Sequence, residues 1–284
     1  MRIPLLLFIF LLSASLAQSQ SRTSYYLGVG GIYYQGELND HDYSHSDLIN
    51  TQFSAGIGYN PNNNLTFQFH FMHGKLTGAD SLSSRRGTRL RNLSFQSTVD
   101  ELSFRTEYKM FATWRKRFIN PFVYAGAGVF WFNPKAELDG ELVELKPLGT
   151  EGQFIQTDDD LYNKPYNLVQ GSGLIGGGVY FRLSDYTKLR FDAAVHLTLT
   201  DYIDDVSSVF PDSLALATAP NGSTAILLSD RNDNGAFPKG GNLRGNESNN
   251  DSYVHFGIGL EINLAGDSKL KSIFRKKQKA CFIK

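Results

Sequence analysis

The sequence has little of what defines the common classes of soluble enzyme. Cys281 is the single cysteine, so an internal disulfide is excluded. The 28 basic side chains equal the 28 acidic ones, and this zero net charge gives no reason to expect a nucleic-acid partner. No stretch approaches the roughly 18 consecutive apolar residues from which a membrane-spanning helix is predicted. These absences exclude an internal disulfide and predict no membrane-spanning helix.

Catalytic and nucleotide-binding motifs are also missing. The chain has no G-x-S-x-G, Walker loop, paired C-x-x-C or H-E-x-x-H. Residues 171–176 match G-x-G-x-x-G by letter, but residues 179–183 continue as an alternating strand, whereas a dinucleotide site needs a helix there. We therefore predict no catalytic residue and no cofactor.

The first residues have the composition of a secretory signal. Arg2 precedes an apolar run at residues 5–12, and Ser15-Leu16-Ala17 is a small-x-small cleavage site with no cysteine after it. We predict a signal peptide at residues 1–17, a folded domain at residues 18–264 and a basic tail at residues 265–284.

Long two-residue alternation is what the chain does have. In residues 101–114, apolar side chains such as Leu102 and Phe104 alternate with charged ones such as Arg105 and Glu107. This predicts a strand of about 14 residues, far longer than the ~5–6 typical of globular proteins. Eight such stretches are predicted: 24–37, 52–59, 65–76, 101–114, 121–133, 169–183, 188–200 and 252–264.

The connections between these strands alternate in length. Short, turn-rich connections lie at residues 60–64, 115–120 and 184–187, and long ones at residues 38–51, 77–100, 134–168 and 201–251. Short turns at one end and long loops at the other are typical of bacterial outer-membrane barrels. The predicted fold is therefore all-β, an eight-stranded antiparallel transmembrane β-barrel with short periplasmic turns, long extracellular loops and both termini in the periplasm.

The charged face is predicted to line the lumen and the apolar face to contact outer-membrane lipid. Glycine is frequent on the lumen face, and opposed charges there can pair. The predicted lumen charge network consists of Glu101, Arg105, Glu107, Lys109, Arg182, Arg190, Asp192 and Glu261. Aromatic residues near strand ends, predicted to form an interface girdle, are Tyr59, Trp114, Phe122, Trp131, Phe132 and Tyr253. The alternative is a soluble, lipocalin-like carrier barrel with the apolar face inside.

Two groups in the long loops could carry chemistry. Asp201, Asp204 and Asp205, with the acids at residues 158–160, could hold Ca²⁺ or Mg²⁺, although such acids more often solvate a loop, and no metal is predicted. His41 and His45 lie in a loop rich in Asn, Asp and Ser. They leave open a lipid A-modifying barrel enzyme, which needs a nucleophile, a base and an acid held together.

Basic residues gather at the predicted periplasmic end. Arg115, Lys116 and Arg117 occupy one short turn, and the tail at residues 265–284 is rich in lysine. Both are candidates for a periplasmic protein contact or for contact with anionic headgroups. The composition of the tail is also typical of a solvated terminus.

Several segments together resemble one family. They are residues 25–40, 91–95, 100–102, 121–136, 145–153 and 200–207. This combination resembles the PorG-type outer-membrane barrels of the Bacteroidota type IX secretion system. The resemblance implies a non-enzymatic subunit, located in the cell outer membrane, that ties a periplasmic ring lipoprotein and its partner subunit to that membrane. It supplies no catalytic residue to carry over, and which related barrel of the family this is stays open.

Overall fold

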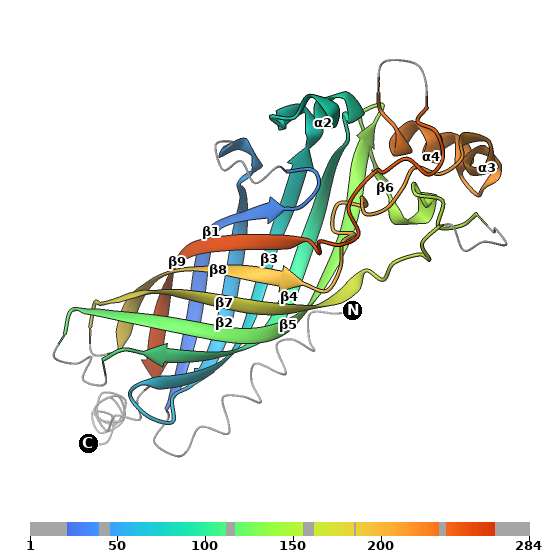
Figure 1. The fold of residues 1–284 in the computed structure, drawn as a ribbon. Helices are drawn as coiled ribbons and strands as arrows, with labels where there is room; N and C mark the ends of the chain where they lie inside the picture. The colour runs from blue at the N-terminus through green and yellow to red at the C-terminus, as the bar shows by residue number, and fades with distance from the viewer. Residues whose placement is uncertain are drawn as a thin grey trace, which may run out of the picture.

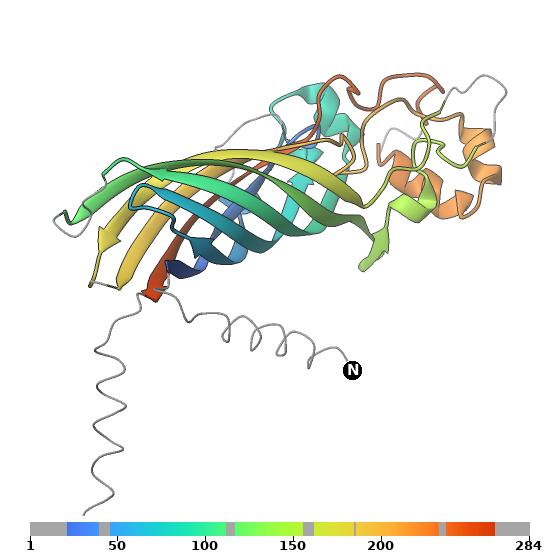
Figure 2. The ribbon, with the colours of Figure 1, turned by 90° about the horizontal axis from the view of Figure 1, so that it is seen from below.

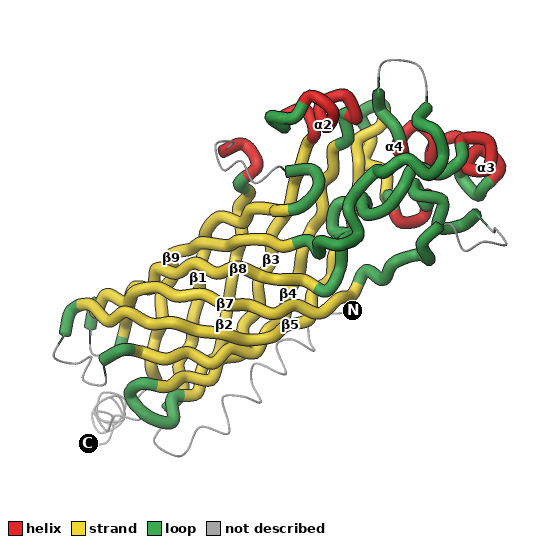
Figure 3. The backbone as a smooth tube through the Cα atoms, in the orientation of Figure 1, coloured by secondary structure: helices red, strands yellow, loops and turns green. Residues whose placement is uncertain are grey.

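The structure is a computed structural model that describes residues 22–39, 46–111, 117–155, 162–184, 186–232 and 237–264. Long strands wind obliquely around a closed barrel, with loops gathered at one end (Figures 1 and 3). The barrel strands are β1 (Thr23–Gln35), β2 (Asn50–Tyr59), β3 (Leu65–Ala79), β4 (Ser94–Lys109), β5 (Ile119–Leu138), β7 (Val169–Arg182), β8 (Thr187–Thr198) and β9 (Ser252–Leu264). Among the described residues, no helix is both long and apolar enough to cross a bilayer.

Every barrel strand pairs antiparallel with both of its neighbours. The order is β4-β3-β2-β1-β9-β8-β7-β5, and the pairing of β4 with β5 closes the barrel. Thr23 lies opposite Leu264, so β1 begins where β9 ends. The eight-stranded antiparallel barrel of outer-membrane type is thus confirmed. The end with the connections after β2, β4 and β7 is called the turn end, and the opposite end the loop end.

The two faces of the strands point as the alternation predicts. Phe67, Phe69 and Phe71 are 37%, 69% and 41% exposed on the outer wall, whereas Arg105 and Glu107 are 0% and 2% exposed inside. A carrier barrel with an apolar interior is therefore excluded. In water, so broad an apolar wall would be unfavourable, but hydrocarbon solvates it.

Four strands, β2, β3, β4 and β5, extend farther toward the loop end than predicted, whereas β1 and β8 each end two residues before the predicted end. β3 continues to Ala79, paired with Ser94, so β4 begins seven residues before the predicted start at Glu101 and ends at Lys109. The predicted boundary was wrong because the inward face of β4 changes character: it is charged from Glu101 onward, but Phe95 and Val99 point inward before it.

Part of the predicted aromatic girdle is also wrong. Phe122, Phe132 and Tyr253 are buried, whereas Tyr59 and Trp131 are exposed on the wall. Trp114 lies outside the described residues. The three buried rings occupy inward-facing positions of their strands. A side chain at such a position points into the barrel even when it lies near a strand end.

The long connections carry structure of their own at the loop end (Figure 2). β6 (Glu141–Glu144) forms a hairpin with β5. Short helices are η1 (Ser46–Leu48), η2 (Asp80–Leu82), α2 (Arg86–Arg91), η4 (Lys146–Leu148), α3 (Ser213–Thr218) and α4 (Gly222–Ser229).

These loops pack together over the barrel mouth. Ile32 and Met72 from the strands share one buried apolar cluster with Leu148, Ile203 and Leu228 from the loops. The described parts of residues 80–93, 139–168 and 199–251 are called the loop cap. Burial of apolar side chains is what holds the cap on the barrel.

Candidate functional site

Ion pairs fill the lumen at the level of the membrane. All predicted lumen charges except Arg182 are buried there: Glu101, Arg105, Glu107, Lys109, Arg190, Asp192 and Glu261. Arg182 instead lies half-buried at the turn end, beside a small cavity. Lys188, which lines the same cavity, also belongs to the network, because its Nζ lies 3.0 Å from Glu261 Oε1. Sequence reasoning missed Lys188, although it shares the parity of Arg190.

Arg190 is the centre of this network. Its guanidinium nitrogens lie 2.8 Å from Glu107 and 3.1 Å from Asp192. The Tyr180 hydroxyl lies 2.6 Å from Glu261 and 3.0 Å from Glu107, joining the two carboxylates. Each of these charges therefore has an oppositely charged or hydrogen-bonding partner, as burial requires.

A second chain of hydrogen bonds runs through two histidines nearer the loop end. His196 Nδ1 lies 2.8 Å from Glu101, and His196 Nε2 lies 2.8 Å from His255 Nδ1. His255 Nε2 lies 3.5 Å from Asp192. Ser172 donates to Glu101 at 2.9 Å. Serine, histidine and an acid thus meet, but the serine bonds the acid rather than the base, and His196 is fully buried. This arrangement is not that of a nucleophile activated by a base.

Arg105 is held differently from Arg190. Its Nε donates to Ser103 Oγ at 3.2 Å, and its guanidinium lies 5.3 Å from the centre of the Tyr124 ring. Neither terminal nitrogen has a hydrogen-bond partner among the described residues. Ring stacking is therefore the main contact of this cation that the structure shows.

Glycine makes room for these side chains. A Cβ on Gly28 would lie 2.1 Å from the Tyr26 hydroxyl, and one on Gly259 would lie 2.5 Å from the Tyr26 ring. The glycine-rich lumen face expected from the sequence is thus required by the packing of the lumen.

Glu151 organises the loop cap. Its carboxylate accepts hydrogen bonds from the backbone amides of Ser207 (2.9 Å) and Ser208 (3.0 Å), and it pairs with Arg244 at 3.0 Å. Glu151 and Ser207 both belong to segments on which the family resemblance rests. Their contact joins two segments that lie far apart in the sequence.

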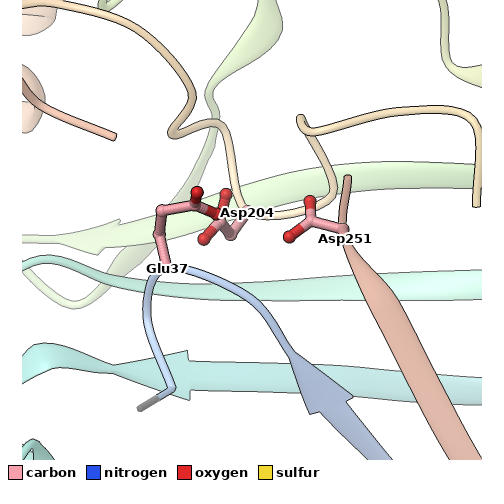
Figure 4. A group of neighbouring side chains, drawn as sticks. All are labelled: Glu37, Asp204 and Asp251. Atoms are coloured by element: carbon pink, nitrogen blue, oxygen red, sulfur yellow. The ribbon is translucent and has the colours of Figure 1, made fainter. Parts of the chain in front are cut away.

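The three predicted rim acids do not form one group. Asp205, at a backbone φ of 68°, accepts hydrogen bonds from Tyr166 (2.7 Å) and Thr150. Asp204 turns instead toward Glu37 and Asp251 (Figure 4). One carboxylate oxygen from each of these three residues lies within 4.8 Å of the others.

Asp204 and Asp251 share one hydroxyl group. The Tyr34 hydroxyl lies 2.6 Å from Asp204 Oδ2 and 2.6 Å from Asp251 Oδ1. The remaining oxygens accept backbone amides, from Val206 to Asp204 at 2.9 Å and from Ile203 to Asp251 at 2.8 Å. Both carboxylates are almost fully buried, and Glu37 is half-buried.

Asp201 lies beside this trio. It is 6% exposed, and neither of its carboxylate oxygens has a hydrogen-bond partner among the described residues. Burial, and next the charge of Glu37, raise the pKa of Asp201 to about 9, while the nearby Ser207 side chain lowers it.

Crowding raises the pKa of the other acids as well. Burial first, and then the charge of Asp204, raise the pKa of Glu37, against two backbone amides and Arg91. Burial, Asp204 and Glu37 hold the pKa of Asp251 well above its usual range. Burial also raises the pKa of Asp204. For Asp205, burial outweighs Arg244 and two hydroxyl donors and raises the pKa to about 6. The cap thus brings together several carboxylates, and ionising all of them at once is unfavourable.

Glu37 and Asp251 were missed as candidates. Glu37 follows the loop end of β1, Asp251 directly precedes β9, and Asp204 follows β8. Because β1, β9 and β8 are adjacent in the barrel, acids at their loop ends converge. The signal was therefore strand order combined with acids at strand ends, rather than clustering along the chain.

Other predicted candidates lie outside the described residues. They are Arg115, Lys116, His41, His45, the acids at residues 158–160, the signal peptide and the basic tail. Arg117 is exposed at the turn end, where its guanidinium lies 4.2 Å from the centre of the Phe111 ring. The periplasmic contact and the enzyme alternative both stay hypotheses.

Comparison with known proteins identifies similar barrels in solved structures. Neisserial surface protein A is 9% identical with a TM-score of 0.43, over 86% of this chain and 98% of that chain. Ail of Yersinia pestis, solved in complex with the heparin analogue sucrose octasulfate, is 8% identical with a TM-score of 0.39, over 84% and 96%. OprG of Pseudomonas aeruginosa is 7% identical with a TM-score of 0.39, over 88% and 99%. At such low identities and scores, these likenesses carry no argument about activity or partners.

Sequence comparison identifies one family. No curated protein matches the chain. Residues 2–144 match the family described as a Domain of unknown function (DUF6089). That match extends from the predicted signal peptide through β1–β5 and the hairpin strand β6. This chain belongs to the family described as Domain of unknown function (DUF6089).

Proposed function

We propose that this protein is a non-enzymatic barrel of the bacterial outer membrane that serves as a structural subunit of the type IX protein secretion machinery. It would link periplasmic ring components, a lipoprotein and its partner subunit, to the outer membrane. The observation that carries the proposal is the filled lumen, where Arg190, Glu107 and Asp192 form buried ion pairs. A barrel with a filled lumen does not conduct solutes, so its function resides in its two ends and its outer wall.

The wall and the two ends support this role. The outer wall exposes a continuous series of large apolar residues, among them Leu27, Phe69 and Ile175, which lipid solvates. In outer-membrane barrels the short turns face the periplasm, so the turn end with Arg117 would face the ring. The PorG-like segments supply the identity of the machinery, and the filled lumen supplies the reason for an anchoring role.

The test is charge reversal at the turn end. Arg115, Lys116 and Arg117 would each be changed to Glu in a chain that also lacks residues 265–284. If this end holds the ring, the periplasmic subunits no longer co-purify with the barrel after cross-linking in intact envelopes, and secretion fails. The variant should still fold as a barrel, because the substitutions change only the turn surface. Heat-dependent gel migration checks that it does.

A matched control reverses three basic residues at the opposite end. Arg85, Arg86 and Arg89 are exposed at the loop end, in and beside α2. Their change to Glu alters the net charge as much as the three turn-end substitutions do but leaves the turn end intact, so co-purification should persist. Unchanged co-purification and secretion in the turn-end variant would refute the proposed role.

A further inference from the structure

The trio of Glu37, Asp204 and Asp251 has the dimensions of a calcium site. Ca²⁺ binds oxygen at 2.3–2.6 Å, so two oxygens on one ion lie at most roughly 4.6–5.2 Å apart. The three ligand atoms of the trio lie within 4.8 Å of one another. They come from three chain segments that the barrel brings together, and their carboxylates face a common space (Figure 4).

Hydrogen bonds leave part of the accepting capacity of these carboxylates unused. The Tyr34 hydroxyl lies 2.6 Å from an oxygen of Asp204 and from one of Asp251, but it has one hydrogen to donate. Glu37 Oε2 is buried and has no hydrogen-bond partner among the described residues. A carboxylate offers about four lone-pair sites, so several remain free on this trio. The group needs a further positive partner, either a metal ion or a shared proton.

The nearby arginines are engaged elsewhere. Arg91 makes two hydrogen bonds of 2.7 Å to Asp80, and Arg244 pairs with Glu151 at 3.0 Å. Among the described residues, no lysine or arginine forms an ion pair with Glu37, Asp204 or Asp251. Buried negative charge in the cap thus exceeds the positive charge that contacts it.

Asp201 is an independent sign of a missing partner. It is buried, both of its oxygens lack hydrogen bonds, and it lies close enough for its charge to raise the pKa of Asp251. A bare buried carboxylate is unfavourable in the folded state unless a cation or a proton neutralises it. Asp201 is thus a fourth buried acid near the trio that has no hydrogen-bond partner among the described residues.

A cavity at the loop end reaches one member of the trio. Glu37 lines a polar cavity of about 690 Å³ at the loop end, together with Asn246 and Asn249. An ion can therefore approach Glu37 through this cavity. Oxygen-only ligands of irregular geometry suit Ca²⁺, which accepts six to eight of them, better than Mg²⁺, which demands a regular octahedron.

We propose that Glu37, Asp204 and Asp251, with Asp201 beside them, bind one Ca²⁺ ion that fixes the loop cap over the barrel. The ion joins the loop ends of β1, β8 and β9. This inference is independent of the secretion role, because it concerns the opposite end of the barrel.

The test titrates Ca²⁺ into the mature chain, refolded in a non-ionic detergent free of lipopolysaccharide. Isothermal titration calorimetry should give one site, with a dissociation constant in the range of about 10⁻⁴ to 10⁻³ M typical of extracellular calcium modules. Terbium luminescence gives a second signal, since the nearby Tyr34 ring can sensitise a bound Tb³⁺ ion. Glu37→Gln and Asp251→Asn should each weaken binding at least tenfold.

The control is Glu144→Gln. Glu144 is an exposed acid of the same end of the barrel, paired with Lys135. Its loss should leave Ca²⁺ affinity unchanged. Absence of Ca²⁺ binding by the unmodified chain at 10 mM ion, on the order of ten times the weakest expected constant, would overturn the proposal in favour of a shared proton. Binding that Glu37→Gln and Asp251→Asn do not weaken would place the ion elsewhere and overturn it equally.

Discussion

At the scale of single residues, the lumen depends on buried charges that are held in ion pairs. Arg190 contacts Glu107 and Asp192, and its guanidinium also lies 4.5 Å from the centre of the Phe122 ring. Removing one partner of a buried ion pair leaves the other as an uncompensated charge, which costs more than the pair contributes. The residue with the most such contacts should therefore be the most sensitive.

Arg190→Met should destabilise the barrel strongly. The change leaves Glu107 with Lys109 at 3.8 Å and leaves Asp192 without its guanidinium. We expect a loss of roughly 3–5 kcal/mol in the free energy of unfolding. Urea unfolding of the protein in lipid vesicles, followed by tryptophan fluorescence, measures it.

Lys135→Met is the matched control for that experiment. Lys135 also forms an ion pair, at 3.0 Å from Glu144, but both side chains are exposed. Its removal should cost about 0–1 kcal/mol. Equal losses in the two variants would contradict the structural role of the lumen network.

At the scale of elements, a strand keeps one register while its surroundings change along its length. The inward side of β4 meets apolar residues at Phe95 and Val99 and charged ones from Glu101 onward. The outward side meets lipid in the barrel region and solvent beyond it. Alternation therefore identified the strands well and their loop ends poorly.

Leu102 and Leu142 allow the membrane boundary to be tested. They are 53% and 51% exposed, but Leu102 lies midway along β4 and Leu142 lies in the β6 hairpin beyond the barrel wall. Leu102→Arg should cost about 2–4 kcal/mol because the charge enters hydrocarbon. Leu142→Arg should change stability by no more than about 0.5 kcal/mol.

Unfolding in vesicles and the yield of folded protein in the outer membrane measure both variants. Because residue type and exposure match, only the surroundings differ between the two positions. A similar effect of the two changes would show that the wall around Leu102 is not in contact with lipid.

At the scale of the whole molecule, the barrel is sealed twice. The ion-paired lumen fills its middle, and the loop cap with Glu151 and Arg244 covers its loop end. An eight-stranded barrel has an interior just wide enough for its own side chains. Size and packing thus agree that solutes do not pass.

The protein should accordingly form no stable channel. Reconstituted into a planar lipid bilayer, it is expected to produce no discrete current steps above the baseline. A sixteen-stranded porin in the same bilayer serves as the positive control. Reproducible steps from the unmodified chain would contradict a closed lumen and remove the main support for an anchoring role.

Local periodicity determined much of this protein by itself. A strand places successive side chains on opposite faces, so alternation at Phe67–Phe71 and around Arg105 was sufficient to identify the strands and their two faces, and glycine and opposed charges on one face indicated which face points inward. Balanced charge on one face was sufficient to predict a paired lumen. Both properties depend on neighbours along the chain.

Only the tertiary structure decided which distant residues meet. Closing the barrel sets β1 beside β9 and β9 beside β8, which brings Glu37, Asp251 and Asp204 together. The same closure directs Asp205 toward Tyr166 and brings Lys188 to Glu261 in the lumen. Loop sequences have no periodicity that predicts the direction of each side chain. The partners of loop residues therefore depend on where the ends of the strands lie in the folded barrel.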